Sequence, residues 1–453
     1  MKRFIKAGIL ALLAVCHTAQ AQTGMDQTAM QIVAEMAPGW NLGNTMEASN
    51  WRTQTALWNN QGGLGAETSW QSTKTTQEII DYVKSLGFKS VRIPCAWALG
   101  HISDADNYTI DAAWMARVKE IVDYCINDGL YVVLNDHWDG GWLEEHIADT
   151  DPNTIAKNKA ILGKLWTQIA EAFKDYDEHL LFAGLNEPNA STQAATNNLL
   201  AYEQVFVDAV RATGGNNQKR VLVVQGPSTN IDHTCNFMKT MPTDETSGKL
   251  AVEVHYYDPW QFWGMEKDES WGKVFYYWGA VNHVSGSQHN ATWGEESYMK
   301  QQLQKMKTNF IDKGYPVVIG EFGANWRNIS TLSGENQDKH NASIKLHYRE
   351  LHHLCKEFGG FVPMVWDIND PNQHGTTGTM TIVNRSNRTV FNTYALEGIN
   401  EIYPQPDITG ISQEPVSIGR INGAAAKYNI AGQRVDDSYK GIVIQNGKKY
   451  VAK

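Results

Sequence analysis

Leu-Leu-Phe-Ala-Gly-Leu-Asn-Glu-Pro-Asn, residues 180–189, is an apolar run that ends in a carboxylate and is stopped by a proline. A second stretch, Pro-Val-Val-Ile-Gly-Glu-Phe-Gly at residues 316–323, has the same layout, with Gly323 as its breaker. Short runs that are apolar throughout are typical of strands buried on both faces, as in a parallel sheet. Glu187 and Glu321 are therefore expected at the carboxyl ends of two buried strands.

Further runs of this kind recur along the chain and alternate with helical patterns. The other strand-like runs are residues 38–42, 90–94, 131–135, 221–225, 250–255 and 361–366. Helical patterns cover residues 75–86, 111–127, 158–176, 197–213, 296–313 and 339–357, and the helix after residues 221–225 is the weakest. Eight strands alternating with helices predict an α/β fold, a (β/α)8 TIM barrel. A doubly wound open sheet is the alternative, but no glycine-rich phosphate fingerprint follows the first run.

The length of 453 residues favours one large domain with small additions. We expect a signal peptide at residues 1–21, the catalytic barrel at 22–404, and a linker with a small β tail at 405–453. The first segment has a basic start, an apolar stretch too short to span a bilayer, and the small-residue site Ala19-Gln20-Ala21. Secretion with cleavage after Ala21 is the expectation, and a lipid anchor at Cys16 is the alternative.

Charge and cysteine content narrow the possible partners. With 39 basic and 49 acidic residues, the net charge of −10 argues against a general nucleic-acid or anionic-membrane surface. No other segment approaches a membrane span, and we expect a monomer without a cofactor. After cleavage four well-separated cysteines remain, without metal-like spacing, and export would permit disulfides. Buried free thiols are expected at Cys95, Cys125, Cys235 and Cys355.

Polar and aromatic residues cluster at the predicted strand ends, where the active sites of such barrels lie. Any one of them has an ordinary structural explanation, but so many strand ends together indicate a site. Two carboxylates at the same end of a barrel are what acid/base and nucleophilic chemistry on a glycosidic bond requires. The candidates are Arg92, Asn135, His137, Trp138, Asp139, Asn186, Glu187, His255, Tyr257, Glu321 and Trp366.

Seven motifs in order carry a family resemblance. They are Gly-Trp-Asn-Leu-Gly-Asn-Thr (39–45), Val-Arg-Ile-Pro (91–94), Leu-Asn-Asp-His-Trp-Asp (134–139), Leu-Asn-Glu-Pro (185–188), Val-His-Tyr-Tyr (254–257), Gly-Glu-Phe-Gly (320–323) and Val-Trp-Asp (365–367). With these motifs the chain resembles glycoside hydrolase family 5, a family of retaining (β/α)8 endo-β-glycanases, over residues 30–404.

The resemblance implies roles for the two glutamates. Glu187 matches the family's general acid/base and Glu321 its nucleophile. It also places Arg92 and Tyr257 beside Glu321, where a cation and a hydroxyl donor would favour the ionised carboxylate. The charge of Glu321 would in turn raise the pKa of Glu187, so that Glu187 holds the proton.

The resemblance also implies substrate contacts. Asn186 matches a residue that binds the sugar 2-OH, and Trp366 matches the aromatic floor of the −1 subsite, where the following peptide is often cis. The loop aromatics Trp138 and Trp142 are expected to add surface to the cleft, as are part of those at residues 260–278. The predicted substrate-binding set is Arg92, His137, Trp138, Asn186, His255, Tyr257, Trp260 and Trp366.

The expected activity is a secreted endo-β-1,4-glucanase, a cellulase acting on plant cell-wall glucans. β-Mannan or glucomannan, xyloglucan and mixed-linkage glucan are alternative substrates for the same mechanism. A non-catalytic glycan-binding barrel is the alternative from another class, but no site residue is missing. No metal is expected, because His137 with Asp139 lacks a third ligand at metal-like spacing. The tail, residues 428–453, resembles type IX secretion sorting tails, with a plain stabilising hairpin as the alternative.

Overall fold

The computed structural model describes residues 24–49, 56–372 and 374–405, together with four strands between residues 427 and 452. The chain divides into two compact units, residues 1–404 and 405–453. The expected signal peptide, its cleavage site and Cys16 lie outside the described residues, as does most of the expected linker.

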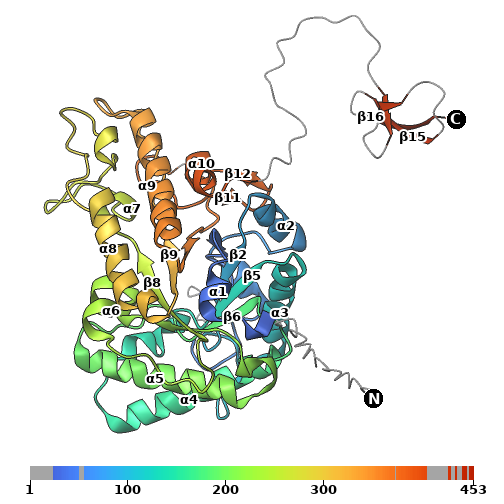
Figure 1. Ribbon diagram of the computed structural model, residues 1–453, viewed down its shortest axis with the longest axis vertical. Coiled ribbons are helices and arrows are strands. Elements are labelled where there is room, and N and C mark those ends of the chain that lie inside the picture. Colours follow the sequence, from blue (N-terminus) through green and yellow to red (C-terminus); the bar gives the residue numbers. More distant parts are fainter. Residues whose placement is uncertain are drawn as a thin grey trace, which may run out of the picture. The chain divides into compact units, whose positions relative to one another are not determined.

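Eight parallel strands close into a barrel in the first unit (Figure 1). The strand order around the barrel is β1-β10-β9-β8-β7-β6-β5-β2, and every residue in these strands is buried. The predicted (β/α)8 barrel is thus confirmed and the open sheet is excluded. The strands are β1 (Gly39–Asn41), β2 (Ser90–Ile93), β5 (Tyr131–Asn135), β6 (Leu180–Ala183), β7 (Leu222–Gln225), β8 (Leu250–Tyr256), β9 (Val317–Phe322) and β10 (Phe361–Val365).

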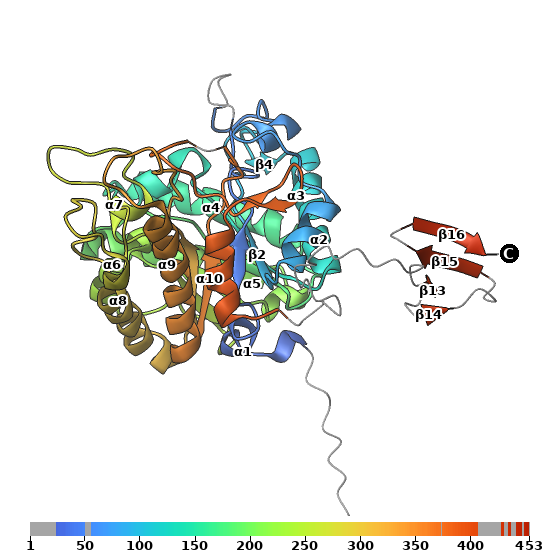
Figure 2. The same ribbon diagram turned by 90° about the horizontal axis from the view of Figure 1, so that it is seen from above.

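Helices connect successive strands and surround the barrel (Figure 2). Two of them start at least four residues earlier than predicted, because their caps lie upstream of the apolar pattern. The side chain of Asp151 accepts from the Thr154 N–H and that of Thr192 accepts from the Ala195 N–H. The helices are α2 (Gln77–Ser85), α3 (Ala112–Asn127), α4 (Pro152–Ala172), α5 (Gln193–Ala212), α6 (Ile231–Phe237), α8 (Glu296–Asn309) and α9 (Gln337–Phe358).

Smaller elements complete the first unit. Apolar residues of α1, among them Ile32 and Val33, pack with barrel residues such as Val133 and Val318, so α1 closes the end away from the polar strand ends. Helix α10 lies along α9 closely enough that a Cβ on Gly398 would meet the Lys345 carbonyl. These elements are α1 (Ala29–Val33), β3 (Ile102–Asp104), β4 (Thr109–Ile110), α7 (Trp260–Trp263), β11 (Val383–Asn384), β12 (Thr389–Val390) and α10 (Thr393–Ile402).

The second unit contains a four-stranded antiparallel sheet in the order β14-β13-β15-β16. This sheet lies within residues 405–453, where the sequence analysis expects a linker with a small β tail. Its strands are β13 (Lys427–Asn429), β14 (Arg434–Val435), β15 (Gly441–Gln445) and β16 (Lys448–Ala452).

Two findings concern the predicted cysteine state and membrane spans. The cysteines at 95, 125, 235 and 355 are buried free thiols, as expected. Among the described residues, no helix has both the length and the apolarity that crossing a bilayer demands.

Candidate active site

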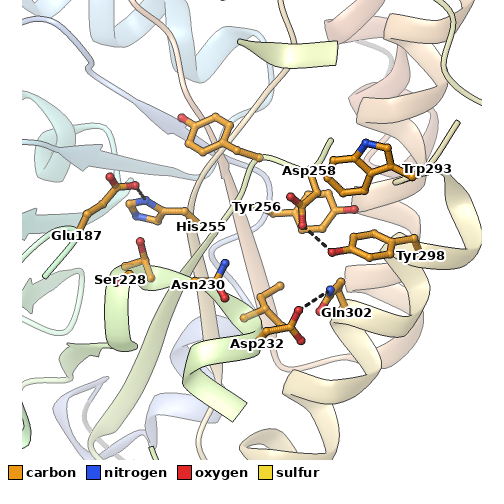
Figure 3. Close-up of a pocket in the computed structure, with 13 residues that line it drawn as sticks. Glu187, Ser228, Asn230, Asp232, His255, Tyr256, Asp258, Trp293, Tyr298 and Gln302 are labelled. Atoms are coloured by element: carbon orange, nitrogen blue, oxygen red, sulfur yellow. Dashed lines mark hydrogen bonds and ion pairs between the residues drawn. The ribbon is translucent and has the colours of Figure 1, made fainter. Parts of the chain in front are cut away.

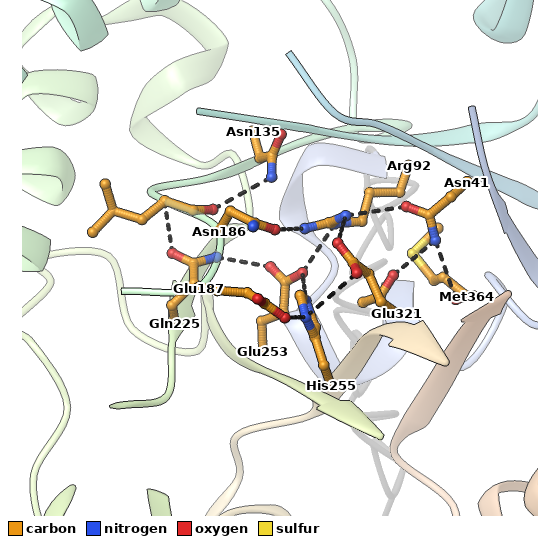
Figure 4. Close-up of polar contacts among 12 residues, drawn as sticks. Asn41, Arg92, Asn135, Asn186, Glu187, Gln225, Glu253, His255, Glu321 and Met364 are labelled. Carbon is orange, nitrogen blue, oxygen red and sulfur yellow. Dashed lines mark hydrogen bonds and ion pairs between the residues drawn. The ribbon is translucent and has the colours of Figure 1, made fainter. Parts of the chain in front are cut away.

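The carboxyl ends of the barrel strands bring two glutamates and a histidine together (Figure 4). Glu187 follows β6, His255 lies on β8 and Glu321 lies on β9. One carboxylate oxygen of each glutamate and one imidazole nitrogen all lie within 4.8 Å of one another. The two carboxyl groups therefore face the same small volume above the barrel.

Glu321 is held by two donors on its two oxygens. Arg92 Nη1 donates to Oε1 over 2.9 Å, and the Tyr257 hydroxyl donates to Oε2 over 3.1 Å. Arg92 is completely buried and Glu321 nearly so. The carboxylate is therefore fixed in orientation before any substrate binds.

A bulge in β9 sets the position of Glu321. Val254 pairs with Ile319, but the next residue, His255, pairs with Glu321, so Gly320 is an extra residue in β9. The Gly320 carbonyl accepts from the Asn41 side chain over 2.8 Å. A Cβ at position 320 would lie 1.8 Å from a carboxylate oxygen of Glu253, so only glycine fits there.

Beneath the glutamates lies a buried polar network centred on Arg92. Arg92 Nε lies 3.0 Å from Glu253 Oε1, and Arg92 Nη2 donates to Asn186 Oδ1 over 2.7 Å. Gln225 Nε2 donates to Glu253 Oε2 over 2.7 Å, and the Gln225 N–H donates to Glu203 Oε1 over 2.9 Å. The network thus extends from the site to helix α5.

The sequence analysis missed Glu253, Gln225 and Glu203. A usable signal existed for Glu253, which stands two residues before His255 in an apolar run and so shares its strand face. Gln225 carried the strand-end signal too, because it is the last residue of the run 221–225, whereas Glu203 carried none, because its partner comes from another element.

His255 links the two catalytic candidates. Its Nδ1 lies 2.6 Å from Glu187 Oε1 and 3.7 Å from Glu321 Oε2, and its Nε2 lies 3.3 Å from Glu253 Oε1. Burial alone would lower the pKa of His255, but these carboxylates raise it to about 10. His255 is therefore protonated at neutral pH and donates to Glu187, whose side chain is 47% exposed.

The pKa directions of the two glutamates differ from the expectation. Burial raises the pKa of Glu187, but the hydrogen bond and charge of His255 outweigh it and the pKa is lowered. Burial raises the pKa of Glu321 against the opposing effects of His255 and Arg92. The sequence analysis predicted a raised pKa for Glu187 and an ionised Glu321. For the site without substrate this is wrong, because a protonated histidine that the sequence did not place lies beside Glu187.

Glu144 fixes the backbone of the acid/base candidate. Its carboxylate accepts from the Glu187 N–H, and its own carbonyl accepts from the Asn189 N–H over 3.0 Å. Burial raises the pKa of Glu144 to about 8, and the nearby Glu187 charge adds to that effect while the hydrogen bond opposes it. Glu144 lies in a loop without a recognisable motif, so the sequence analysis missed it.

His137 and Trp366 form one wall of the site. Their rings lie nearly parallel with centroids 5.9 Å apart. Burial, with the charges of Arg92 and His255, lowers the pKa of His137 well below its usual value, so the ring is neutral. Asn135 Nδ2 lies 3.2 Å from His137 Nδ1, which assigns the ring proton to Nε2.

The peptide after Trp366 does not have the expected cis geometry. The cis peptides among the described residues are Ala37–Pro38 and Asp258–Pro259. Side-chain hydrogen bonds shape the turn instead, because the Asp367 carboxylate accepts from the N–H groups of Asn369, Ile382 and Val383.

The side chains of the predicted aromatic residues Trp138 and Trp260 are exposed. Trp138 is 41% exposed and, with Trp70 and Leu57, lines a separate cavity of about 440 Å³. Trp260 is 45% exposed and meets Trp263 edge-on, and the Trp263 ring packs on Tyr257. Both therefore offer exposed aromatic surface.

Other expected cleft aromatics turn out to be core residues. Trp142 is buried and meets Trp58 edge-on. In the aromatic segment after β8, the side chains of Phe262, Tyr276, Tyr277 and Trp278 are buried. Trp260 and Trp271 in the same segment are exposed, and the expected role of such residues in a cleft stays a prediction.

The residues considered for a metal are engaged in other contacts. The Asp139 carboxylate accepts from the N–H groups of Ala98 and Leu99 over 2.6 and 2.7 Å, so it closes a loop rather than serving His137. Both oxygens of Glu321 already accept hydrogen bonds. This arrangement is better suited to moving protons than to holding an ion, and the absence of a metal requirement stays a prediction.

Comparisons with known proteins agree with this geometry. The family model Cellulase (glycosyl hydrolase family 5) matches residues 54–372. Endoglucanase A of Paenibacillus barcinonensis is 37% identical over 386 residues, covering 80% of this chain and 87% of that protein.

Two solved structures are similar over most of their length. One is a GH5 xyloglucan-specific β-1,4-glucanase from a ruminal metagenomic library, in complex with XXLG. It is 49% identical with a TM-score of 0.75, covering 83% of this chain and 96% of that one. The other is a GH5-4 broad-specificity endoglucanase from Bacteroides salanitronis, 34% identical with a TM-score of 0.70, covering 84% and 96%.

Proposed function

This chain belongs to the cellulase family, glycosyl hydrolase family 5, and from that membership we propose that it is a retaining endo-β-1,4-glucanase. The observation that carries the stereochemistry is the closeness of Glu187 and Glu321, whose nearest oxygens lie within 4.8 Å. Retaining enzymes need carboxyl groups roughly 5–5.5 Å apart, whereas inverting enzymes need roughly 6.5–9.5 Å to admit a water.

In the first step Glu321 attacks the anomeric carbon as the bond to the leaving oxygen breaks. Arg92 and Tyr257 hold the attacking carboxylate in place. His255, whose Nδ1 lies 2.6 Å from Glu187, supplies the proton that Glu187 passes to the leaving oxygen, so Glu187 ends this step as a carboxylate. The acid is therefore the Glu187–His255 pair, with Glu187 the member that touches the substrate.

In the second step water attacks the same carbon and releases Glu321. Glu187 now accepts a proton from the water, as the reverse of its first role demands. Asn186 supports both steps, because Arg92 holds its oxygen and leaves its amide nitrogen to donate to the sugar 2-OH. His137 donates from Nε2, and Trp366 supplies an aromatic face beside it.

Among the substrates, xyloglucan has specific support. The structural relative that is 49% identical over 83% of this chain is described as xyloglucan-specific. The open cavity with Trp70 and Trp138 adds aromatic surface, and sugar rings pack their C–H faces on such surfaces. Unbranched glucan remains a second candidate substrate, because another structural relative is described as a broad-specificity endoglucanase. Rates on xyloglucan, cellulose, mixed-linkage glucan and glucomannan, measured side by side, decide the order, and dominance of mannan would overturn the glucan assignment.

Replacement of the nucleophile tests the mechanism. Glu321→Ala should lower hydrolysis of carboxymethyl-cellulose by more than about 10⁴-fold, a loss of the size seen when a nucleophile is removed. Azide should then restore turnover of an activated aryl β-glycoside and give the inverted glycosyl azide. Full activity in Glu321→Ala would sink the assignment.

We also propose that the enzyme is exported. The support is the basic start, short apolar stretch and small-residue cleavage site in residues 1–21. Mass spectrometry of the mature protein from its own host should find an N-terminus at Gln22. A lipid-modified Cys16 at the N-terminus would favour surface anchoring instead.

A further inference from the structure

We propose that a cavity beside Glu187 binds a single branch sugar carried by the leaving-group half of the substrate (Figure 3). This inference rests on the proposed function, because it assigns a place to the branches of a xyloglucan-type chain. The cavity has a volume of about 260 Å³.

The location of the cavity assigns it to the leaving-group side. Glu187 and His255 form its mouth, and the segment 228–232 after β7 and Tyr256–Asp258 at the end of β8 form its walls. The residues described as lining it are on the side of the acid and do not include Glu321. Because the acid/base carboxyl touches the leaving oxygen, space behind it belongs to the leaving sugar and its substituents.

Two hydroxyl groups buried beside the cavity have no hydrogen-bond partner. Thr229 and Tyr256 both line the cavity and are buried, and neither Thr229 Oγ1 nor the Tyr256 hydroxyl has a hydrogen-bond partner. An unpaired buried polar group costs about 1–3 kcal/mol. Ser228 and Thr229 also have positive φ values of 53° and 42°, an unfavourable backbone for a β-branched residue. Such costs are typical of a functional site.

The chemistry of the walls suits a neutral sugar. Asp258 accepts from the Tyr298 hydroxyl over 3.0 Å, which positions its carboxylate as an acceptor for ligand hydroxyls, whereas both oxygens of Asp232 are already engaged, one by Gln302 and the other by Lys305. At the rim, the Trp293 indole is 39% exposed and meets Tyr298 edge-on, which leaves an aromatic face for a sugar ring.

The size and course of the cavity favour a branch over the main chain. It reaches between α6 and α8 to the buried Gln302, so it leads away from the mouth at Glu187 (Figure 3). That space holds one sugar ring, whereas a continuous glucan chain needs an open groove.

The rim tryptophan gives the first test. In the full chain, Trp293→Ala should lower kcat/KM on xyloglucan by about tenfold, equivalent to about 1.4 kcal/mol. Its kcat/KM on cellohexaose and on an aryl β-cellobioside should stay within about twofold of the wild type. Trp271→Ala is the matched control, because Trp271 is 66% exposed on the same connection and does not line the cavity. Equal losses on branched and unbranched chains would overturn the branch assignment.

The buried hydroxyl gives a second test that separates binding from structure. Tyr256→Phe should raise KM for xyloglucan and leave cellohexaose unchanged. If the hydroxyl has only a structural role, its removal should leave both KM values unchanged and keep or raise the unfolding temperature, since an unpaired group is lost. That second result would overturn the proposal.

Glycosyl transfer tests whether the cavity serves the leaving-group side of the site, because in this reaction the acceptor occupies the place of the leaving group. With an aryl β-cellobioside as donor, an acceptor 4-OH attacks the anomeric carbon of the glycosyl-enzyme, the bond to Glu321 breaks, and Glu187 takes the proton. Xyloglucan oligosaccharides should be better acceptors than cellotetraose in the wild type but not in Trp293→Ala. A wild type that cleaves unbranched glucan but shows no preference for branched acceptors would sink this inference alone. A wild type that cleaves no glucan would sink the proposed function.

Discussion

At the scale of single residues, His255 controls the charge of the site. Its pKa of about 10 exceeds its unfolded value of about 6.5. The raised pKa means that the stability gained from its protonated form is fully present below pH 6.5 and is lost as the pH rises through 10. Within the working range of a neutral enzyme, His255 thus keeps one proton beside Glu187.

Replacing the acid/base should expose how much each substrate depends on leaving-group protonation. Glu187→Ala should slow cellulose and xyloglucan hydrolysis by about 10²–10⁴-fold, the usual contribution of general acid catalysis. Formation of the glycosyl-enzyme from a dinitrophenyl glycoside should change little, because that leaving group needs no proton. Pre-steady-state release of dinitrophenol measures the first step directly. A similar slowing of that step on both substrate types would contradict the assignment.

At the scale of elements, the β9 bulge and the α5 contact each make a prediction. Gly320→Ala places a Cβ 1.8 Å from a Glu253 oxygen, so β9 or the buried carboxylate must shift. We expect a stability loss of about 1–3 kcal/mol, as for other overpacked cores, together with loss of activity. Denaturant unfolding and initial rates measure the two effects.

A helix glycine serves as the control for this substitution. In Gly163→Ala the nearest atom to the new Cβ, on Val205, lies at 3.4 Å, an ordinary contact. Because alanine favours helix over glycine, this variant should be as stable as the wild type or more stable by about 0.5–1 kcal/mol. Wild-type stability and activity in Gly320→Ala would show that the bulge does not depend on glycine.

Glu203 on α5, which accepts from the Gln225 N–H on β7, makes the stability of the fold depend on pH. Burial raises the pKa of Glu203 to about 8, so the folded protein holds a proton that the unfolded chain releases near pH 4.5. Stability contributed by this proton falls as the pH rises from 4.5 to 8. Glu203→Gln should therefore unfold at a higher temperature than the wild type at pH 8–9 and show a flatter pH profile. Glu171→Gln, an exposed change on α4, should leave the profile unaltered.

The strands could be predicted more closely than the helix starts. Strand ends were correct to within about two residues, because a buried parallel strand has an apolar run that stops where the site begins. The starts of α4 and α5 lay upstream, because Asp151 and Thr192 cap segments whose first turns are polar. Pro152 was a readable signal for the first of these starts.

The site residues that stand at strand ends could be predicted from the sequence. The residues that support them from within the barrel or from a neighbouring loop could not. Arg92, Asn186 and His255 stand in motifs at strand ends, and the structure brings them together with the glutamates. Glu203 and Glu144 become neighbours of the site only through the closure of the barrel. Which glutamate has the lower pKa depends on the 2.6 Å contact between Glu187 and His255, and no sequence spacing specifies that contact.

At the scale of the whole molecule, the division at residue 404 predicts an independent barrel. A chain ending at Asp407 retains α10 and every residue of the candidate site. We expect its kcat/KM on soluble glucan and its unfolding temperature to match those of the full chain. Calorimetry and initial rates check this, and a clear loss of stability would show that residues 408–453 support the barrel.

The extra residue in β9 makes the orientation of the nucleophile depend on the number of residues in that strand. Side chains alternate in and out along a strand, so the inserted Gly320 resets that alternation just before the nucleophile. Deleting one residue between Val317 and Gly320 would restore regular pairing and turn the Glu321 carboxylate out of the catalytic centre. Loops transplanted onto this barrel must therefore leave unchanged the number of residues inside β9, and must also keep the connections that carry Glu144, Glu187 and Tyr257.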